Sequence, residues 1–254
     1  MLLEARGLTK RFGGLVAIDD LDFDIPHGKI TAIIGPNGAG KSTCFNAIAG
    51  FYPLTSGTLR FAGEDVTALP ADAMARRGIA RTFQTTSLFA NESVLDNAIA
   101  GCHRQTRSGL FDALVRTRRT RREERACRET AYEALAFAGI ADLAPRIAGS
   151  IPQEAQKRLA IAIAVASDPK LVLLDEPVAG VTSEETAAHE ALIRAMAARG
   201  QTICLVEHKM SLVMGLADRI VVLHHGRKIA DGTPDEVSND PAVIDAYLGA
   251  ARHA

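Results

Sequence analysis

A glycine-rich loop at residues 35–42, with the sequence GPNGAGKS, constrains the fold of this chain more than any other feature. It matches the pattern G-x-x-x-x-G-K-[ST], in which backbone N–H groups wrap phosphates and the next helix points its positive end at them. An apolar run at 30–34 precedes the loop, and a helical pattern at 42–50 follows it. This arrangement predicts a nucleotide site in an α/β domain, where Lys41 would reach the β- and γ-phosphates and Ser42 would hold Mg²⁺. The residues predicted to bind the nucleotide here are Gly35, Pro36, Asn37, Gly38, Ala39, Gly40, Lys41, Ser42 and Thr43.

A second motif lies at residues 171–177, LVLLDEP, where four apolar residues are followed by two carboxylates. Two acids at the end of a strand are common by themselves, but together with the loop they fit a Walker B strand. Asp175 would lie behind Mg²⁺ through a water molecule, and Glu176 would orient and polarise the attacking water. Both carboxylates are therefore candidate site residues.

The composition narrows the class of protein. Hydrophobic residues make up 47% of the 254, so the chain can bury a sizeable core. The formal charge of −1 argues against a generally basic nucleic-acid binder. No apolar run approaches the roughly 20 residues that span a bilayer, and the N-terminus does not have the layout of a signal peptide. The cysteines lack a C-x-x-C pair and indicate free thiols in a reducing cytosol; they are Cys44, Cys102, Cys127 and Cys204.

Apolar periodicity predicts a strand-rich start, a helical middle and a second α/β part. The expected strands are 2–8, 15–23, 30–34, 58–61, 171–174, 202–206, 219–224 and 228–230. The expected helices are 42–50, 94–100, 109–116, 121–137, a buried helix over 159–166, 182–199, 211–216 and a terminal helical region from Pro234 to about 248. Thr182 and Glu185 have the spacing of a capping box for the helix at 182–199.

Taken together, these motifs resemble the ABC transporter ATPases over nearly the full length of the chain. The resemblance implies ATP and Mg²⁺ as ligands and a P-loop NTPase (RecA-like) α/β core with an N-terminal antiparallel β region and an inserted α-helical subdomain. We expect one domain over 1–254, with the core at 1–88 and 161–254 and the insertion, including the signature region, at 89–160.

The resemblance also assigns three residues outside the two motifs. Phe12 matches the aromatic residue that stacks on adenine, although a phenylalanine of the core is the plain alternative. Gln84, in the sequence RTFQ, matches the glutamine that senses Mg²⁺ and faces the membrane subunits. His208 matches the switch histidine that contacts the γ-phosphate. Residues 179–182 occupy the position of the D-loop.

One stretch departs from the family in a way that predicts asymmetry. Where the family has the signature LSGGQ, this chain has IPQEA at 151–155. Pro152 lacks the hydroxyl, Gln153 and Glu154 add Cβ atoms where glycines allow close approach, and Glu154 adds a carboxylate near a triphosphate. Because each site in this family uses the signature of the opposite subunit, we expect one hydrolytic site on this chain and one weak or silent site. The alternative is that the helix shifts and the altered segment still binds. Thr182, where the family often has Asp or Asn, also departs.

Several segments are similar to the LivG-type branch, which serves high-affinity import of branched-chain amino acids. They include RTFQ at 81–84, VEHKM at 206–210, LVMGLADRI at 212–220 and AYLG at 246–249. Lys209 stands where aspartate is usual. This branch implies a second, different ATPase subunit, two transmembrane permeases, a periplasmic or extracellular substrate-binding protein, and a peripheral location on the cytoplasmic face of the inner membrane.

Other interpretations remain open at this stage. The same type of ATPase could drive transport of another substrate, such as the export of lipopolysaccharide. That exporter has a homodimeric ATPase, which should need an intact signature in every chain. A non-transport ABC protein usually carries two ATPase domains or a coiled coil, and a pseudo-ATPase would not need Glu176 and His208. The arginine-rich segment 104–128 could be a solvated face, a contact with the permease or anionic lipid, or, least favoured, a nucleic-acid surface.

Overall fold

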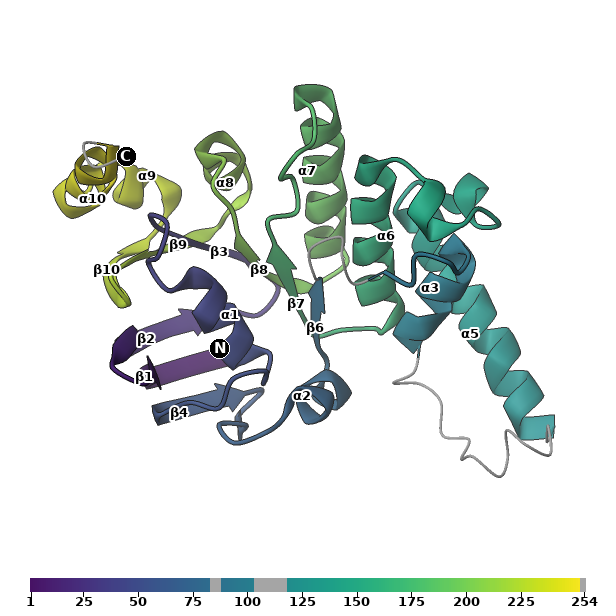
Figure 1. The fold of residues 1–254 in the computed structure, drawn as a ribbon, viewed down its shortest axis with the longest axis horizontal. Helices are drawn as coiled ribbons and strands as arrows, with labels where there is room; N and C mark the ends of the chain where they lie inside the picture. Colours follow the sequence, from purple (N-terminus) through teal and green to yellow (C-terminus); the bar gives the residue numbers. More distant parts are fainter. Residues whose placement is uncertain (83–87, 103–117, 252–254) are drawn as a thin grey trace. The chain divides into compact units, whose positions relative to one another are not determined.

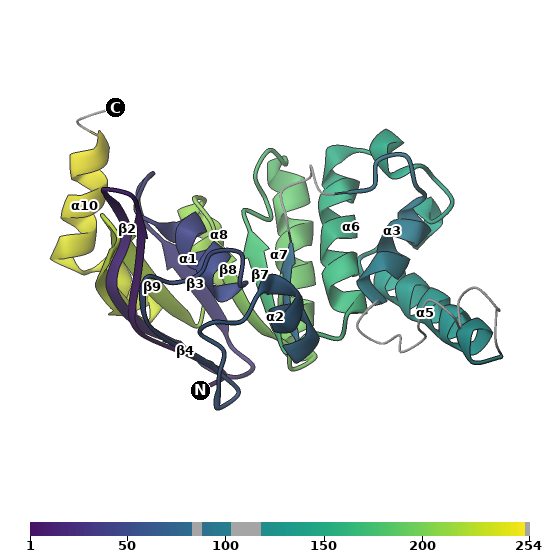
Figure 2. The ribbon, with the colours of Figure 1, turned by 60° about the horizontal axis from the view of Figure 1, so that its bottom comes forward.

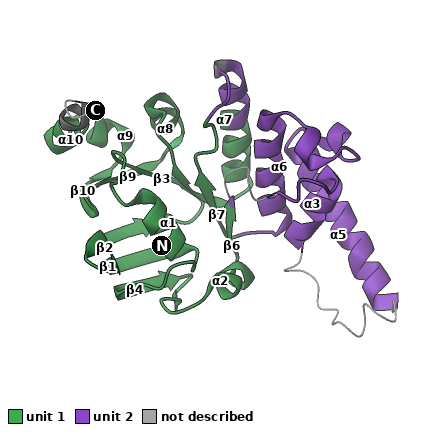
Figure 3. Cartoon of the chain, viewed as in Figure 1, with its two compact units in different colours: residues 1–81, 170–179, 190–254 green, residues 82–169, 180–189 purple. Residues whose placement is uncertain are grey.

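The computed structural model describes residues 1–82, 88–102 and 118–251 (Figure 1). The chain divides into two compact units, one formed by 1–81, 170–179 and 190–254, and the other by 82–169 and 180–189 (Figure 3). The predicted insertion, 89–160, falls inside the second unit. The mixed α/β class predicted from the sequence is confirmed.

The first unit contains a four-stranded antiparallel sheet in the order β2-β1-β4-β5. Its strands are β1 (Leu3–Phe12), β2 (Leu15–Ile25), β4 (Ser56–Phe61) and β5 (Glu64–Asp65). Leu3, Ala5 and Leu8 of β1 are fully buried, and polar side chains between them are not, as expected for a sheet with one face on the core. These strands lie beside helix α1 (Lys41–Ile48) in both views (Figures 1 and 2).

The second sheet of this unit places the site. Its strands run in the order β10-β9-β3-β8-β7-β6, with β3 parallel to β8 and β9, and β7 parallel to β8. Because the carboxyl ends of parallel strands meet at one edge, the segments after β3, β7 and β8 come together there. The strands are β3 (Ile30–Ile34), β6 (Ile79–Thr82), β7 (Leu171–Asp175), β8 (Thr202–Val206), β9 (Arg219–His224) and β10 (Arg227–Gly232).

One hydrophobic core joins the two sheets and α1. Phe45 and Ile48 of α1 are fully buried against side chains such as Phe61 of β4 and Val206 of β8. All four cysteines are buried and free, and burial raises the pKa of the Cys44 thiol to about 12. No helix in the described part of the chain is both long and apolar enough to cross a membrane.

The second unit is helical. Its described helices α3 (Val94–Ala100), α5 (Arg118–Phe137) and α6 (Gln153–Ala166) pack on one another, with short 3₁₀ turns at Ala141–Leu143 and Ala148–Ser150. Helix α7 (Ser183–Ala198) begins in this unit and ends in the first. At its start, Thr182 N donates to Glu185 Oε2 (2.7 Å) and Glu185 N to Thr182 Oγ1 (3.3 Å), so the predicted capping box is confirmed.

The structure corrects several predicted elements. Helix α2 (Ala71–Arg77) and strand β6 were not predicted, and α6 begins six residues before the expected 159. The terminal helical region is two helices, α9 (Pro234–Ser238) and α10 (Pro241–Ala251), because Pro241 starts a new helix. Helix α8 (Met210–Leu216) lies where it was expected. The helix predicted at 109–116 lies outside the described residues.

Candidate nucleotide-binding site

The loop after β3 has a backbone that only glycine permits at two points. Gly40, the N-cap of α1, has φ of 100°, and a Cβ there would lie 2.4 Å from the carbonyl oxygen of Ala17. A Cβ on Gly35 would lie 2.1 Å from the carbonyl oxygen of Leu223. No side chain caps the start of α1, so its first N–H groups face the loop and can bind an anion.

Lys41 lies in this loop with its side chain directed back over it. The residue is only 6% exposed, and its Nζ donates to the carbonyl oxygens of Gly35 (2.7 Å) and Pro36 (3.0 Å). Desolvation lowers the pKa of Lys41, and the nearby carboxylates of Glu176 and Asp175 partly oppose that shift. The structure therefore gathers one ammonium and two carboxylates at the carboxyl edge of the sheet.

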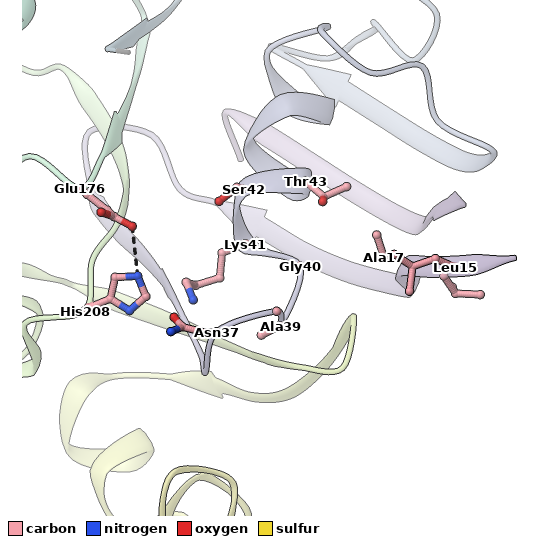
Figure 4. Close-up of a pocket in the computed structure, with 12 residues that line it drawn as sticks. Leu15, Ala17, Asn37, Ala39, Gly40, Lys41, Ser42, Thr43, Glu176 and His208 are labelled. Atoms are coloured by element: carbon pink, nitrogen blue, oxygen red, sulfur yellow. Dashed lines mark hydrogen bonds and ion pairs between the residues drawn. The ribbon is translucent and has the colours of Figure 1, made fainter. Parts of the chain in front are cut away.

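A pocket of about 370 Å³ opens over the loop (Figure 4). This volume lies within the range of small-ligand sites, roughly 300–1,000 Å³. One wall is apolar and comes from the start of β2, and the other walls come from the loop and from the ends of β7 and β8. The lining residues are Leu15, Val16, Ala17, Asn37, Gly38, Ala39, Gly40, Lys41, Ser42, Thr43, Glu176 and His208.

Glu176 and His208 lie next to each other in the wall of this pocket (Figure 4). The Nε2 atom of His208 lies 3.1 Å from Oε1 of Glu176. The two side chains follow neighbouring parallel strands, and Glu176 N also donates to Val206 O (2.9 Å). Glu176 has φ of 48°, a left-handed conformation that costs a non-glycine residue about 1–3 kcal/mol and that persists where the surroundings fix it. The geometry can hold a water molecule beside a carboxylate and a hydrogen-bonding imidazole.

Asp175 has a partner that the sequence analysis did not identify. The guanidinium of Arg81 donates to Asp175 Oδ2 (2.8 Å) and to Asn46 Oδ1 (2.6 Å), and the Arg81 and Asp175 side chains are 9% and 11% exposed. The sequence predicted no role for Arg81 beyond its place in the RTFQ segment. A signal was available, because a buried acid at a strand end needs a cation or several N–H donors.

The donor set fits magnesium. Mg²⁺ prefers oxygen ligands and is commonly held by one or two carboxylates, substrate phosphates and water. Ser42 offers an exposed hydroxyl in the pocket, and Asp175 offers a carboxylate at the end of β7. Among the described residues, no cluster of three or more His, Cys, Asp or Glu side chains could hold a metal by itself.

Of the remaining predicted site residues, Phe12 is not among the residues that line this pocket, and Gln84 is not described. Phe12 ends β1, is 42% exposed, and packs edge-on against Tyr52 with ring centroids 5.3 Å apart. Lys10 Nζ lies 4.9 Å from the centre of the Phe12 ring. The described pocket takes its apolar wall from β2 and not from Phe12. Gln84 lies outside the described residues.

Comparison with known proteins identifies the family. The family model described as "ABC transporter" matches residues 18–179, and a second, described as "Branched-chain amino acid ATP-binding cassette transporter", matches 227–253. The chain belongs to the ABC transporter family. It is 40% identical over 251 residues to the high-affinity branched-chain amino acid transport ATP-binding protein BraF of Pseudomonas aeruginosa, with 98% of each chain covered. The same identity and coverage hold for LivG of Escherichia coli, which has the same description.

Solved ABC structures share this fold. The ADP conformation of an ATP-binding cassette of an ABC transporter matches with a TM-score of 0.85 and 30% identity, covering 98% of both chains. A nucleotide-free ATP-binding cassette matches with a TM-score of 0.83 and 30% identity, covering 97% of this chain and 98% of that one. The P-loop NTPase fold predicted from the sequence is confirmed.

The predicted signature position, 151–155, lies at the start of helix α6. Helix α6 begins at Gln153, with Pro152 as an N-cap that makes no side-chain hydrogen bond. The Gln153 amide lies next to Gly180 of the D-loop, 3.4 Å from where a Cβ would be. Glu154 forms an ion pair with Arg158, one helical turn on, and both side chains are about one-fifth exposed.

Proposed function

We propose that this chain hydrolyses ATP as the energy-converting subunit of an ABC importer for branched-chain or related amino acids. The observation that carries the proposal is the facing pair Glu176 and His208 over a phosphate-binding loop, in a chain whose C-terminal segment matches the branched-chain amino acid transporters. The relatives BraF and LivG are described as high-affinity branched-chain amino acid transport ATP-binding proteins.

The residues divide the chemistry of ATP hydrolysis among them. Backbone N–H groups of 35–43 and the Lys41 ammonium hold the phosphates. Glu176 orients and polarises the attacking water, and His208, fixed on Glu176, contacts the γ-phosphate. Phe12 stacks on adenine after a change of its packing on Tyr52, and Gln84 senses the metal.

Magnesium would be held by Ser42 directly and by Asp175 through water, with Gln84 as a further ligand. When bound, Mg²⁺ neutralises phosphate charge that develops during the reaction. Arg81 keeps the Asp175 carboxylate oriented in its absence, since the pair is buried and in hydrogen-bond contact.

The second ATPase of the complex is a different chain. Each ABC site combines the loop of one subunit with the signature of the other, and the signature here has lost its hydroxyl and both glycines. The proposed complex is therefore a heterodimer with one hydrolytic site, built on this chain's Lys41 and Glu176. It works beneath two permease subunits that receive cargo from a substrate-binding protein, on the cytoplasmic face of the inner membrane.

Reconstitution tests the proposal. The chain is placed in vesicles with MgATP, together with a second ATPase, two permeases and a substrate-binding protein of the branched-chain amino-acid transport type from the same organism. We expect uptake of leucine, isoleucine or valine that depends on ATP, and loss of uptake in the Lys41→Ala variant. ATP hydrolysis without uptake of any of these amino acids would keep the ATPase and reject the cargo, and the absence of hydrolysis would reject both.

A further inference from the structure

Glu207 is a buried carboxylate next to His208, and the proposed chemistry gives Glu207 no role. It lies between the last residue of β8, Val206, and His208, and is only 4% exposed. A buried charge is costly unless hydrogen bonds satisfy it. The hydrogen-bond partners of the Glu207 carboxylate therefore indicate its role.

The partners are backbone N–H groups from two separate segments. Oε1 of Glu207 accepts from Val178 N (3.0 Å), and Oε2 accepts from His208 N (2.9 Å) and more weakly from Lys209 N (3.3 Å). Hydrogen bonds between a carboxylate and backbone N–H groups are roughly twice as strong as neutral ones. The side chain thus clamps the loop after β7 to the loop after β8.

These two loops carry the facing pair. Val178 comes two residues after Glu176, and His208 follows Glu207 directly. The loops are also joined by Glu176 N to Val206 O (2.9 Å) and by the 3.1 Å contact between the two side chains. Among these links, the Glu207 carboxylate is the one in which a single side chain binds the backbone of both loops. A substitution at Glu207 therefore removes this link without changing the backbone bond from Glu176 N to Val206 O.

The conformation of Glu176 gives the clamp its importance. With φ of 48°, the Glu176 backbone is in a region that a non-glycine residue leaves unless its neighbours hold it. The Glu207 bond to Val178 N is one of the contacts that does so. We propose that Glu207 is a positioning residue that keeps Glu176 and His208 in register for hydrolysis, a role that rests on the proposed ATPase function.

The test separates the rate of hydrolysis from nucleotide binding. In Glu207→Gln, the amide NH₂ group faces one of the backbone donors and leaves it unpaired. Because small misplacements of a catalytic group are costly, we expect kcat of the reconstituted complex to fall about tenfold to a hundredfold. The KM for MgATP, and the affinity of the purified chain for a fluorescent ATP analogue, should stay within about twofold, since the loop at 35–43 is unchanged.

Asp218 provides a control in which a carboxylate also accepts from a backbone N–H group, at a more exposed position where it pairs with Lys29 as well. Its Oδ2 accepts from Ile30 N (2.8 Å) at the opposite end of β3, so Asp218→Asn makes the same chemical change far along the strand from the loop. Asp218→Asn should lower the melting temperature but leave kcat within about twofold. Glu207→Asp retains the charge on a shorter side chain, and its kcat should lie between those of the wild type and Glu207→Gln.

Two results would overturn the positioning role. One is a Glu207→Gln complex that hydrolyses ATP as fast as the wild type. The other is an Asp218→Asn complex that loses as much kcat, since the loss would then follow from stability alone. If Glu207→Gln does not fold, the Glu207→Asp and Asp218→Asn rates decide in the same way. A wild-type complex without ATPase activity would reject the proposed function itself, which is a different outcome.

Discussion

The pocket over residues 35–43 and the signature turn at 151–155 are the two halves of ABC chemistry, and this chain treats them differently. The pocket retains a buried ammonium at Lys41 and a facing pair, Glu176 and His208. The turn at 151–155 leads into helix α6, but it contains neither the hydroxyl nor the glycines of the LSGGQ pattern that the family resemblance predicts there. Fold and chemistry can therefore separate within one subunit.

The residues at 153 and 154 favour the helix that begins there. Glutamine and glutamate are better helix formers than glycine by roughly 0.5–1 kcal/mol per residue. Glu154 lies in the first turn, where a negative charge suits the helix dipole, and pairs with Arg158. Both residues therefore suit the stability of the helix, whereas neither suits binding of the γ-phosphate of an ATP held by the partner subunit.

The largest expected effect is the difference between substituting Glu176 and substituting the corresponding glutamate of the proposed second ATPase. Glu176→Gln should lower ATP turnover of the complex by about a hundredfold or more, because it removes the group that polarises the water. The same substitution in the Walker B glutamate of the second ATPase should leave turnover within about twofold. Steady-state phosphate release measures both, and equal losses would contradict the asymmetry.

Glu190→Gln is the matched control for that comparison. Glu190→Gln is the same substitution of glutamate by glutamine, made on α7, where the Glu190 carboxylate pairs with Arg194. Turnover should be unaffected there. A loss with Glu190→Gln would show that the effect of Glu176→Gln follows from charge or stability and not from its place beside His208.

A smaller effect should follow repair of the signature. The triple variant Pro152→Ser, Gln153→Gly, Glu154→Gly restores the hydroxyl and the room for close approach. We expect turnover of the complex to rise about twofold, from one working site to two, since signature donors stabilise the transferring phosphoryl group. In that background the partner's glutamate should become important, and a repaired complex that remains insensitive to it would disprove the role assigned to 151–155.

The smallest effect concerns Arg158, which neutralises Glu154 and also donates to Ala138 O (3.3 Å). Arg158→Gln should cost about 1 kcal/mol of stability, or about 2–4 °C in melting temperature. It should also weaken ATP-dependent association with the second ATPase by up to about fivefold, because the Glu154 charge would then face a triphosphate alone.

Arg194 offers an equivalent pair for comparison. It binds Glu190 one turn before it and the carbonyl oxygen of Gly215, as Arg158 binds Glu154 and Ala138. Because the Arg194 and Glu190 side chains are 52% and 33% exposed, against 22% and 19% for Arg158 and Glu154, Arg194→Gln should lower the melting temperature by a smaller amount, without affecting association. Calorimetry and an association assay distinguish the two variants, and identical results would remove the functional role of Arg158.

Much of the fold could be predicted because local signals agree with the tertiary structure. The strands β3, β8 and β9 have the predicted bounds, since continuous apolar runs between turn residues are typical of buried parallel strands. Helix α2 and strand β6 were missed because neither has a clear apolar period: β6 is only four residues long and contains Arg81.

The site shows the same limit. The two motifs predicted a site with Lys41 and Glu176, the family resemblance added His208, and the structure brings all three to one pocket. Neither Arg81 beside Asp175 nor the clamp at Glu207 could be predicted, because each depends on a contact between segments far apart in the sequence. The local sequence indicates only that charged residues lie in or next to strands at these positions, and it does not indicate their partners.

Sedimentation of the Glu176→Gln chain with MgATP tests the asymmetric heterodimer most directly. The substitution should trap any ATP-bound dimer by blocking hydrolysis. We predict a monomer when the chain is alone and a dimer only when the second ATPase is added. A stable dimer of Glu176→Gln alone would show that 151–155 still serves as a signature, and would contradict the asymmetric heterodimer.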